Sequence, residues 1–499
     1  MKASRCLIPY DATAVSSCEG TRPASLAGPG RLIRHRKLMM FGAGLLLLIS
    51  SAIGVKSQGA AGPLRACKEN PRYFTDGSGK AVYLTGAHTW NNLQDMGPTY
   101  PPPVFDFKSY LDFLEQHHHN FIRLWRWELL SWNTAANNEK ESRIHFAGPH
   151  PWARTGADKA LDGKPKFNLK SFDNAYFERL RSRVTEANRR GIYVSIMLFE
   201  GWGLQFVAEG WKAHPFHPDN NENGVGVSIK LEGKGLTIFT LAHPEITRLQ
   251  EAYVRKVIDT VNDLDNVLFE ISNENHPPST EWQYHFIRFI QEYEKTKPRQ
   301  HPVGMTFQYK GGANAVLSAS PADWISPNPT AEQGYDYRTN PPPADGRKVI
   351  LTDTDHLWGI GGDVEWVWKS FLRGLNPIFM DPYKREILSG GPEERWEPVR
   401  KALGHTRRFA EKMNLKSVIP HPELATTGYC LAHPGVEYLV YQPKAGESFS
   451  IDLKAGTYRF EWLDTAKGTT AGEGRVEAPG GMQEFKPALA GDAVLYLKR

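Results

Sequence analysis

Two apolar stretches of the 499-residue chain each end in a group of polar side chains that could do acid–base chemistry. The stretch 266–276, NVLFEISNENH, ends in Asn273, Glu274 and His276. The stretch 348–356, KVILTDTDH, ends in Asp353, Asp355 and His356. Two carboxyl groups that flank a scissile bond can act as a protonated acid and as an ionised nucleophile or base. The chain therefore offers Glu274 as one such group and an aspartate of the second stretch as the other.

The second stretch allows two interpretations. Side chains alternate along a strand, so Asp353 and Asp355 point to the same side if the strand continues through both. One carboxylate would then react, while the other orients it or binds substrate. The same residues with His356 and Asp381 would also suit Ca²⁺ or Zn²⁺ as ligands, although no HExxH or other strongly spaced metal motif occurs. We predict no metal and no other cofactor, and we keep a metal-dependent hydrolase as an alternative.

The elements that position these groups follow a regular alternation. Runs that are apolar on both faces are typical of strands in a parallel sheet, and catalytic side chains of a (β/α)8 barrel stand at the carboxyl ends of such strands. Strands are expected at 81–85, 120–128, 192–199, 266–276, 303–308, 324–326, 348–355 and 377–383. Helices are expected at 107–118, 172–190, 244–264, 280–297, 364–373 and 397–413. We predict an α/β fold, a (β/α)8 TIM barrel with a long loop at 129–169 over its active face.

The character of the sequence changes near residue 418. Short alternating strands separated by Gly-rich turns follow, which favours a small all-β sandwich domain. The predicted organisation is therefore a targeting segment at 1–61, a catalytic barrel at 62–417 and an accessory sandwich at 418–499.

The targeting segment carries an apolar run, Leu38–Val55, with a basic flank before it and small residues after it. This order is typical of a cleaved signal peptide. A retained membrane anchor is the alternative, because the run is long enough to span a bilayer. We therefore expect a secreted, periplasmic or cell-surface protein.

Composition narrows the partners. The 60 Lys and Arg against 55 Asp and Glu give a net charge of only +5, so nucleic acid is not an expected partner. The 14 Trp and 19 Tyr supply flat faces on which sugar rings can stack. Only Cys67 and Cys430 lie beyond the targeting segment, and although they could pair, two cysteines make no disulfide framework. The oligomeric state is not predicted.

Three short motifs, Asn-x-x-Arg at 120–123, Ser-Asn-Glu at 272–274 and the strand 348–353, resemble the large clan of retaining (β/α)8 glycoside hydrolases. The resemblance implies that Glu274 is the acid/base and that Arg123 supports the nucleophile. It also favours Asp353 as nucleophile, because Asp353 falls where the clan carries Glu. Asp is one methylene shorter, so either the backbone lies closer to the substrate or the enzyme inverts. With the elements 458–464 and 491–496, the chain looks most similar to bacterial apiosidase-like glycosidases whose C-terminal sandwich is named for collagen binding.

The expected substrate is a carbohydrate held at the strand ends. The predicted substrate-binding residues are His88, Trp90, Arg123, Trp125, Glu200, Trp202, Asn273, His276, His356 and Trp358. The tryptophans among them would either form the walls of sugar subsites or pack as core beneath the loops. A carbohydrate- or matrix-binding surface protein without catalytic activity is a further alternative.

Overall fold

The computed structural model describes residues 59–133, 144–227, 233–388 and 391–499. The predicted apolar export run at 38–55 lies outside these residues. Within the described part of the chain, no helix is long and apolar enough to cross a membrane.

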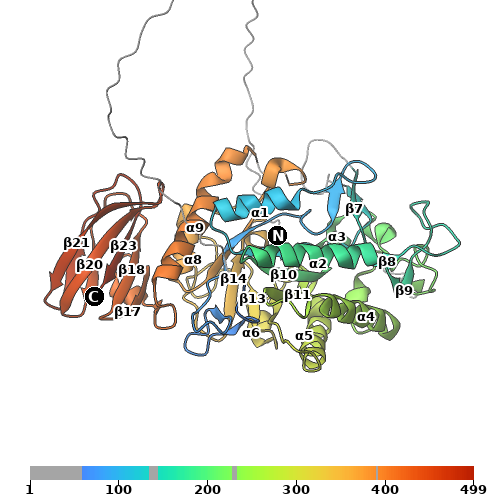
Figure 1. Ribbon diagram of the computed structural model, residues 1–499, viewed down its shortest axis with the longest axis horizontal. Helices are drawn as coiled ribbons and strands as arrows, with labels where there is room; N and C mark the ends of the chain where they lie inside the picture. The colour runs from blue at the N-terminus through green and yellow to red at the C-terminus, as the bar shows by residue number, and fades with distance from the viewer. Residues whose placement is uncertain (1–58, 134–143, 228–232, 389–390) are drawn as a thin grey trace, which may run out of the picture. The chain divides into compact units, whose positions relative to one another are not determined.

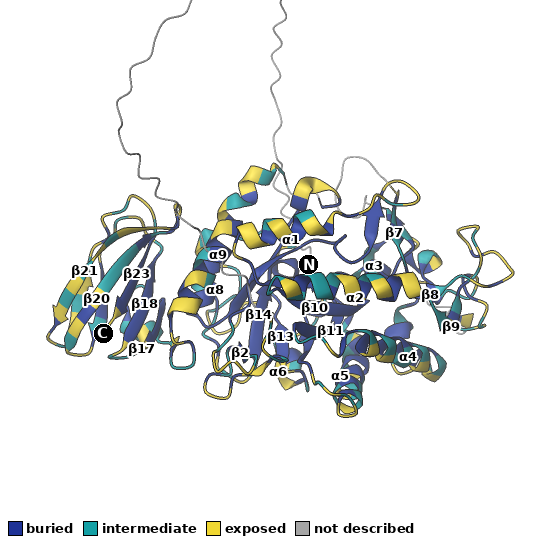
Figure 2. Cartoon of the chain, viewed as in Figure 1, coloured by how far each residue is buried: buried dark blue, intermediate teal, exposed yellow. Residues whose placement is uncertain are grey.

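Eight parallel strands form the predicted barrel (Figure 1). They are β3 (Gly86–His88), β5 (Phe121–Leu124), β10 (Tyr193–Glu200), β11 (Val267–Asn273), β12 (Val303–Thr306), β13 (Trp324–Ser326), β14 (Val349–Asp353) and β15 (Asn376–Met380). Every residue of these strands is buried, which fits the apolar runs that predicted them (Figure 2). The first strand begins at Gly86 rather than at residue 81, and the seventh ends at Asp353 rather than at residue 355.

The seam of the barrel lies between β3 and β5, which are the two ends of the strand order. No ladder joins these two strands in the described residues, but the backbones come very close, because a Cβ on Gly86 would lie 2.1 Å from the Phe121 carbonyl oxygen. Asn120 closes the lower part of the seam. Its Nδ2 donates to the Tyr83 carbonyl at 2.8 Å, and its Oδ1 accepts from the Thr85 N–H at 2.9 Å.

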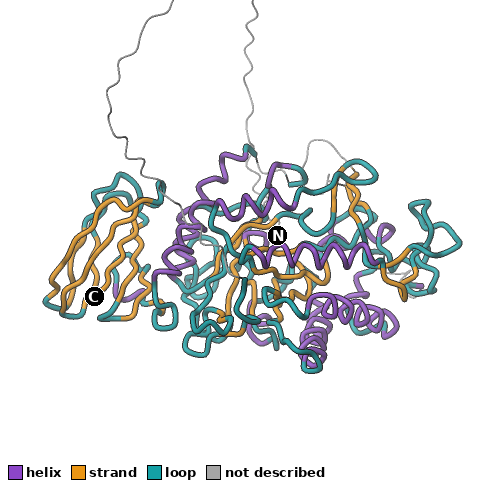
Figure 3. Tube along the Cα trace, in the orientation of Figure 1, coloured by secondary structure: helices purple, strands orange, loops and turns teal. Residues whose placement is uncertain are grey.

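The long helices surround the sheet (Figure 3). They are α1 (Phe107–Gln116), α2 (Asn174–Arg189), α4 (Pro244–Val261), α5 (Thr280–Glu294), α8 (Val364–Leu372) and α9 (Glu397–Lys412). All six were predicted, with bounds that differ from these by a few residues. Asp106 and Asp173 cap α1 and α2 by accepting backbone N–H groups, and Gly191, with φ 67°, follows α2 in the left-handed conformation.

Short elements were not predicted. They include α3 (Trp202–Phe206), α6 (Asn314–Ala319), α7 (Thr354–Leu357) and the 3-10 turns η2 (Gly210–Ala213), η4 (Leu236–Phe239), η5 (Pro277–Ser279), η6 (Tyr383–Arg385), η7 (Glu393–Trp396) and η8 (Pro422–Leu424). The segment expected as a loop at 129–169 instead contains strands. β6 (Ser131–Asn133) and β7 (Ile144–Gly148) form a sheet with β4 (Asp95–Gly97), and β8 (Trp152–Ala153) pairs with β9 (Asn168–Phe172). A further small pair is β1 (Arg65–Ala66) with β2 (Phe74–Thr75).

The C-terminal part is all-β. A six-stranded antiparallel sheet contains β16 (Ile419–Pro420), β17 (Cys430–His433), β18 (Glu437–Gln442), β23 (Ala493–Lys498), β20 (Gly456–Asp464) and β21 (Thr469–Ala478). The pair β19 (Phe449–Leu453) and β22 (Gly481–Phe485) packs on it through a shared apolar core. A second apolar cluster joins Trp368 of α8 and Phe409 of α9 to Tyr441 and Tyr496 of the sheet. Cys67 and Cys430 are buried free thiols and do not pair.

Candidate active site

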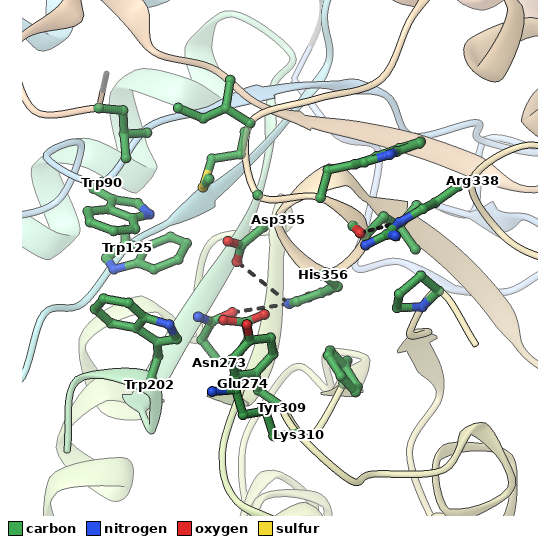
Figure 4. Close-up of a pocket in the computed structure, with 18 residues that line it drawn as sticks. Trp90, Trp125, Trp202, Asn273, Glu274, Tyr309, Lys310, Arg338, Asp355 and His356 are labelled. Carbon is green, nitrogen blue, oxygen red and sulfur yellow. Dashed lines mark hydrogen bonds and ion pairs between the residues drawn. The ribbon is translucent and has the colours of Figure 1, made fainter. Parts of the chain in front are cut away.

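A pocket of about 570 Å³ opens at the carboxyl ends of the barrel strands (Figure 4). Its lining includes the predicted residues Trp90, Trp125, Trp202, Asn273, Glu274, Asp355, His356 and Trp358. It also includes Phe307, Tyr309, Lys310 and Arg338, which were not predicted. The structure therefore brings most of the predicted side chains to one cavity.

Glu274 is the first residue after β11. Its backbone has φ 43°, a left-handed conformation that a non-glycine residue rarely adopts, and its carbonyl accepts a hydrogen bond from Gln205 Nε2 at 2.8 Å. Its carboxyl group has no hydrogen-bond partner among the described residues, and it borders the pocket. Burial and the nearby carboxyls of Asp355 and Glu200 raise the pKa of Glu274 well above its ordinary value. Glu274 is therefore held as a neutral acid that can give a proton.

Asp353 and Asp355, both predicted on the seventh strand, lie on different elements. β14 ends at Asp353, whose carboxyl caps the short helix α7 by accepting the Asp355 N–H at 2.9 Å. Equal parity of Asp353 and Asp355 was predicted for a strand that continues through both, and this condition is not met, because the chain turns into this helix. Asp355 lies on the pocket wall, whereas Asp353 is absent from that wall and borders a narrow crevice next to it.

Asp353 is bound tightly from two strands. His88 Nε2 of β3 lies 2.9 Å from Asp353 Oδ2, and Arg123 Nη1 of β5 donates to the same oxygen at 3.0 Å. Burial alone would raise the pKa of Asp353, but His88 and Arg123 outweigh burial and hold that pKa well below its ordinary value. Asp353 is therefore an ionised group in the buried layer beneath the pocket, which we call the floor.

Asp355 shares the same arginine. Arg123 Nη1 donates to Asp355 Oδ2 at 3.0 Å. Burial raises the pKa of Asp355 to about 6, with Arg123 opposing and Asp353 adding to the rise. At neutral pH this gives an ionised carboxylate on the wall of the cavity.

Arg123 is the centre of the floor. Its Nε and Nη2 make a bidentate pair with Glu270 of β11 at 2.9 and 2.6 Å, and Nη2 also donates to Asn273 Oδ1 at 2.7 Å. Arg123 therefore holds the carboxylates of Glu270, Asp353 and Asp355 in one buried network. Glu270 was not predicted, because its place inside an apolar strand gives no sign that it faces Arg123.

The contacts of Asn273 fix the proton on His356. Because Asn273 Oδ1 accepts from Arg123, His356 Nε2, at 3.1 Å from the same oxygen, must be the donor. Nδ1 then accepts from the Ser326 hydroxyl at 2.6 Å. Burial and Arg123 hold the pKa of His356 well below its ordinary value, so the ring is neutral. Asn273 Nδ2 has no partner among the described residues and remains available to a substrate hydroxyl.

Tryptophans form one side of the pocket (Figure 4). The ring of Trp90 lies 5.5 Å from that of Trp125 and 6.0 Å from that of Trp202. Trp90 and Trp125 are nearly buried, so they act both as wall and as packing for the loops. Trp358 lies on the rim, with 37% of its surface exposed.

Four predicted substrate-binding residues do not line the pocket: Arg123, which binds the carboxylates beneath it, and three others. His88 is fully buried and contacts Asp353. Glu200 accepts the backbone N–H groups of Trp202 and Gly203, at 2.6 and 3.0 Å, and so caps α3. His276 contacts Asn275 Oδ1 at 2.8 Å through Nδ1. The end of a strand predicts nearness to the site, but it does not show which way each side chain turns.

The alternative metal site is not assembled. Asp381 forms a buried bidentate ion pair with Arg400, at 2.8 and 2.6 Å, instead of joining Asp353 and Asp355. The described residues contain no group of three or more His, Cys, Asp or Glu that could hold a metal ion.

Comparisons with known proteins agree with this architecture. A family model described as "Domain of unknown function (DUF6298)" matches residues 146–321, and no curated protein matches the sequence. A solved structure named "Glycoside hydrolase" has a TM-score of 0.54 and 11% identity, covering 88% of this chain and 97% of that chain. A glycoside hydrolase family 5 protein from Bacteroides vulgatus ATCC 8482 has a TM-score of 0.55 and 11% identity, covering 88% and 93%. At this identity the likeness establishes the fold that these hydrolases share with the chain.

Proposed function

We propose that the protein is a glycoside hydrolase that cleaves a glycosidic bond in an oligo- or polysaccharide. The observation that supports this most is that two buried carboxyl groups, Glu274 and Asp355, line one aromatic-walled pocket at the mouth of the barrel. Glu274 is kept protonated, while Asp355, with a pKa of about 6, is ionised at neutral pH. Such a pair supplies the acid and the reacting carboxylate of glycoside hydrolysis.

In the proposed mechanism, Glu274 protonates the glycosidic oxygen while the bond from that oxygen to the anomeric carbon breaks. The Asp355 carboxylate attacks the anomeric carbon and forms a glycosyl ester. The Glu274 carboxylate then takes a proton from water, whose oxygen attacks the same carbon and releases Asp355. The product keeps its anomeric configuration, which nuclear magnetic resonance of the first product formed would show.

We assign the reacting role to Asp355 instead of Asp353, which the resemblance favours. Asp353 does not border the pocket, and both of its oxygens contact His88. Its low pKa also marks a weak nucleophile. Asp353 is instead proposed to position Arg123, and through it Asp355.

The test is hydrolysis of a panel of plant and bacterial polysaccharides and aryl glycosides, with and without EDTA. We expect Glu274→Gln and Asp355→Asn each to lower kcat by about 10²- to 10⁴-fold, since each removes a group that acts in the transition state. Glu178→Gln, on the exposed face of α2, is the matched control and should be fully active. EDTA should have no effect.

Other outcomes would each replace part of the proposal. An active Asp355→Asn beside an inactive, folded Asp353→Asn would return the reacting role to Asp353. Loss of activity with EDTA would indicate the metal-dependent hydrolase. Glycan binding that survives Glu274→Gln, with no turnover on the whole panel, would indicate the binding protein.

We also propose that residues 1–61 direct export and that the C-terminal sheets are an accessory domain of the apiosidase-like type. The basic flank and apolar run of the sequence support export. The export proposal is tested by recovering the protein outside the cytoplasm and measuring its molecular mass by mass spectrometry. Cleavage near residue 61 would indicate a signal peptide, and an uncleaved membrane-bound chain would indicate an anchor.

A further inference from the structure

Two positively charged side chains, Lys310 and Arg338, line the pocket without an anionic partner among the described residues. No carboxylate of those residues forms a salt bridge with either. Lys310 is exposed and Arg338 half-buried, so both can be reached by a substrate. Of the other ionisable groups that line the pocket, Glu274 and Asp355 act in the proposed mechanism, His356 is neutral, and Tyr309 is a phenol whose pKa is raised by burial.

Arg338 lies in the connection between β13 and β14, where hydrogen bonds hold its backbone and its Nε. Asp336 Oδ1 accepts the N–H of Arg338 and of Thr339, each at 2.8 Å, which fixes the turn. The side-chain Nε donates to the Leu357 carbonyl at 2.5 Å, and the guanidinium lies 5.7 Å from the ring centre of Trp358. The two Nη groups remain unpaired among the described residues. These are the groups with which an arginine grips a carboxylate by two parallel hydrogen bonds.

Lys310 is presented from the loop after β12. Its backbone has φ 56°, again a left-handed conformation of a non-glycine residue, and its Nζ lies 4.6 Å from the ring centre of Phe206. The ammonium is therefore placed over aromatic rings beside the cavity. It adds a second positive charge at the mouth.

Arg338 lies in a different part of the pocket from the carboxyl groups of Glu274 and Asp355. The carboxylate of Asp355 would repel a second carboxylate close to it. In the view of Figure 4, Arg338 lies across the pocket from Trp90 and Trp125, and Asp355 lies between the two sides. An anionic group of a substrate would thus be accepted at Arg338, while the neutral ring that carries the scissile bond lies beside Glu274 and Asp355.

We infer that the substrate is an anionic glycan, in which Arg338 binds the carboxylate of a uronic acid next to the sugar that is cleaved, and Lys310 adds attraction. This inference rests on the proposed glycosidase function of the same pocket, and it names the substrate class. The two unpaired Nη groups can bind both oxygens of a carboxylate through parallel hydrogen bonds.

The test compares native glucuronoxylan, in which uronic acids branch from a neutral backbone, with the same polymer after reduction of its carboxylates to alcohols. We expect the wild-type protein to have a kcat/KM about 10- to 100-fold higher on the native form of its substrate, since hydrogen bonds between charged groups are lost on reduction. Arg338→Gln should bring the native-to-reduced ratio close to one, with Arg338→Lys in between. Arg248→Gln, on the exposed face of α4, should keep the wild-type ratio.

Binding of the native and reduced polymers to Glu274→Gln, followed by calorimetry, separates this inference from the proposed function. If Arg338-dependent binding of the native polymer occurs without hydrolysis by the wild type, the proposed function fails and the anion site stands. If neutral or reduced glycans are hydrolysed as well as native ones and depend on Glu274, the proposed function stands and the inference is overturned. A preference for sulfated over carboxylated glycans, or no binding of any acidic glycan, also overturns it.

Discussion

Glu274 combines three unusual properties at a single residue. It lies at the end of a buried strand, its backbone is left-handed, and its pKa is raised by burial and by neighbouring carboxyls. Strained backbone conformations persist where the surrounding structure enforces them, often at functional sites. Here the turn directs the acid into the pocket.

The pH dependence of activity should report the two carboxyl groups of the pocket. Below about pH 6, Asp355 is protonated and cannot attack, so kcat/KM should fall about tenfold per pH unit on the acid side. At higher pH, Glu274 loses the proton that it must donate, so activity should fall again above its raised pKa. Initial rates from pH 4 to 10 measure both limbs. Activity that stayed level down to pH 4 would instead indicate a reacting carboxylate with a low pKa, such as Asp353.

Arg123 should be essential to stability as well as to activity. Arg123→Ala leaves Glu270, Asp353 and Asp355 buried without their counter-charge, so the free energy of unfolding should drop by about 3–5 kcal/mol. Denaturant unfolding measures the change. Arg181→Ala removes an exposed ion pair with Asp263 and should cost no more than about 1 kcal/mol. Similar values for the two variants would contradict the network.

Single site residues could be predicted from the sequence only where they follow a recognisable strand or motif. Glu274 and Asp355 stand beside recognisable strands, and the spacing Asn-x-x-Arg pointed to Arg123. Lys310 and Arg338 lie in irregular connections that meet the pocket only in the folded chain, so no local pattern singled them out. The separation of Asp353 from Asp355 depended on a four-residue helix, α7, which periodicity cannot detect.

At the scale of elements, the buried strands and the long helices were predictable because burial leaves a pattern in the sequence. A buried strand is apolar on both faces, and a long helix carries a stripe of apolar residues over eight or more positions. The strands β6 to β9 have two to five residues each and no clear alternation, and they were missed. The Asp at the end of β14 illustrates the same limit. An aspartate can end a strand and also cap the next helix, and the sequence alone does not decide between continuation and capping.

Glu200, at the end of β10, should make stability depend on pH through α3. Burial raises the pKa of Glu200 to about 8. Backbone N–H groups that donate to the carboxyl oppose this rise, and the nearby carboxyl of Glu128 adds to it. The folded protein thus holds a proton that the unfolded chain releases near pH 4.5, so this group's contribution to stability is lost as pH rises toward 8. Glu200→Gln keeps an oxygen for the cap and cannot ionise.

The melting temperature, measured between pH 5 and 8.5, should therefore fall less steeply for Glu200→Gln than for the wild type. Glu178→Gln serves as the control, since that residue lies on the surface of α2. Parallel curves for wild type and Glu200→Gln would show that Glu200 does not hold the proton.

At the scale of the whole molecule, the barrel and the C-terminal sheet share an apolar cluster. Trp368 of α8 is fully buried, with ring centres 5.9 Å from Phe409 and 6.3 Å from Tyr441. Trp368→Ala should lower the free energy of unfolding by about 3–5 kcal/mol, because it leaves a large cavity. Trp358→Ala on the pocket rim should cost much less. Calorimetry should show one transition for barrel and sheet together, and two well-separated transitions would contradict the shared core.

The buried charged residues beneath the pocket also hold β3 and β5 together at the seam of the barrel. Asn120 fastens the lower end of the seam, and at the upper end His88 of β3 and Arg123 of β5 both grip Asp353. The side chains that set the pKa of Asp353 thus also connect the two end strands of the barrel. An attempt to re-engineer the reaction by changing these residues would loosen the scaffold at the same time, so new chemistry is better sought on the connections that carry Lys310 and Arg338.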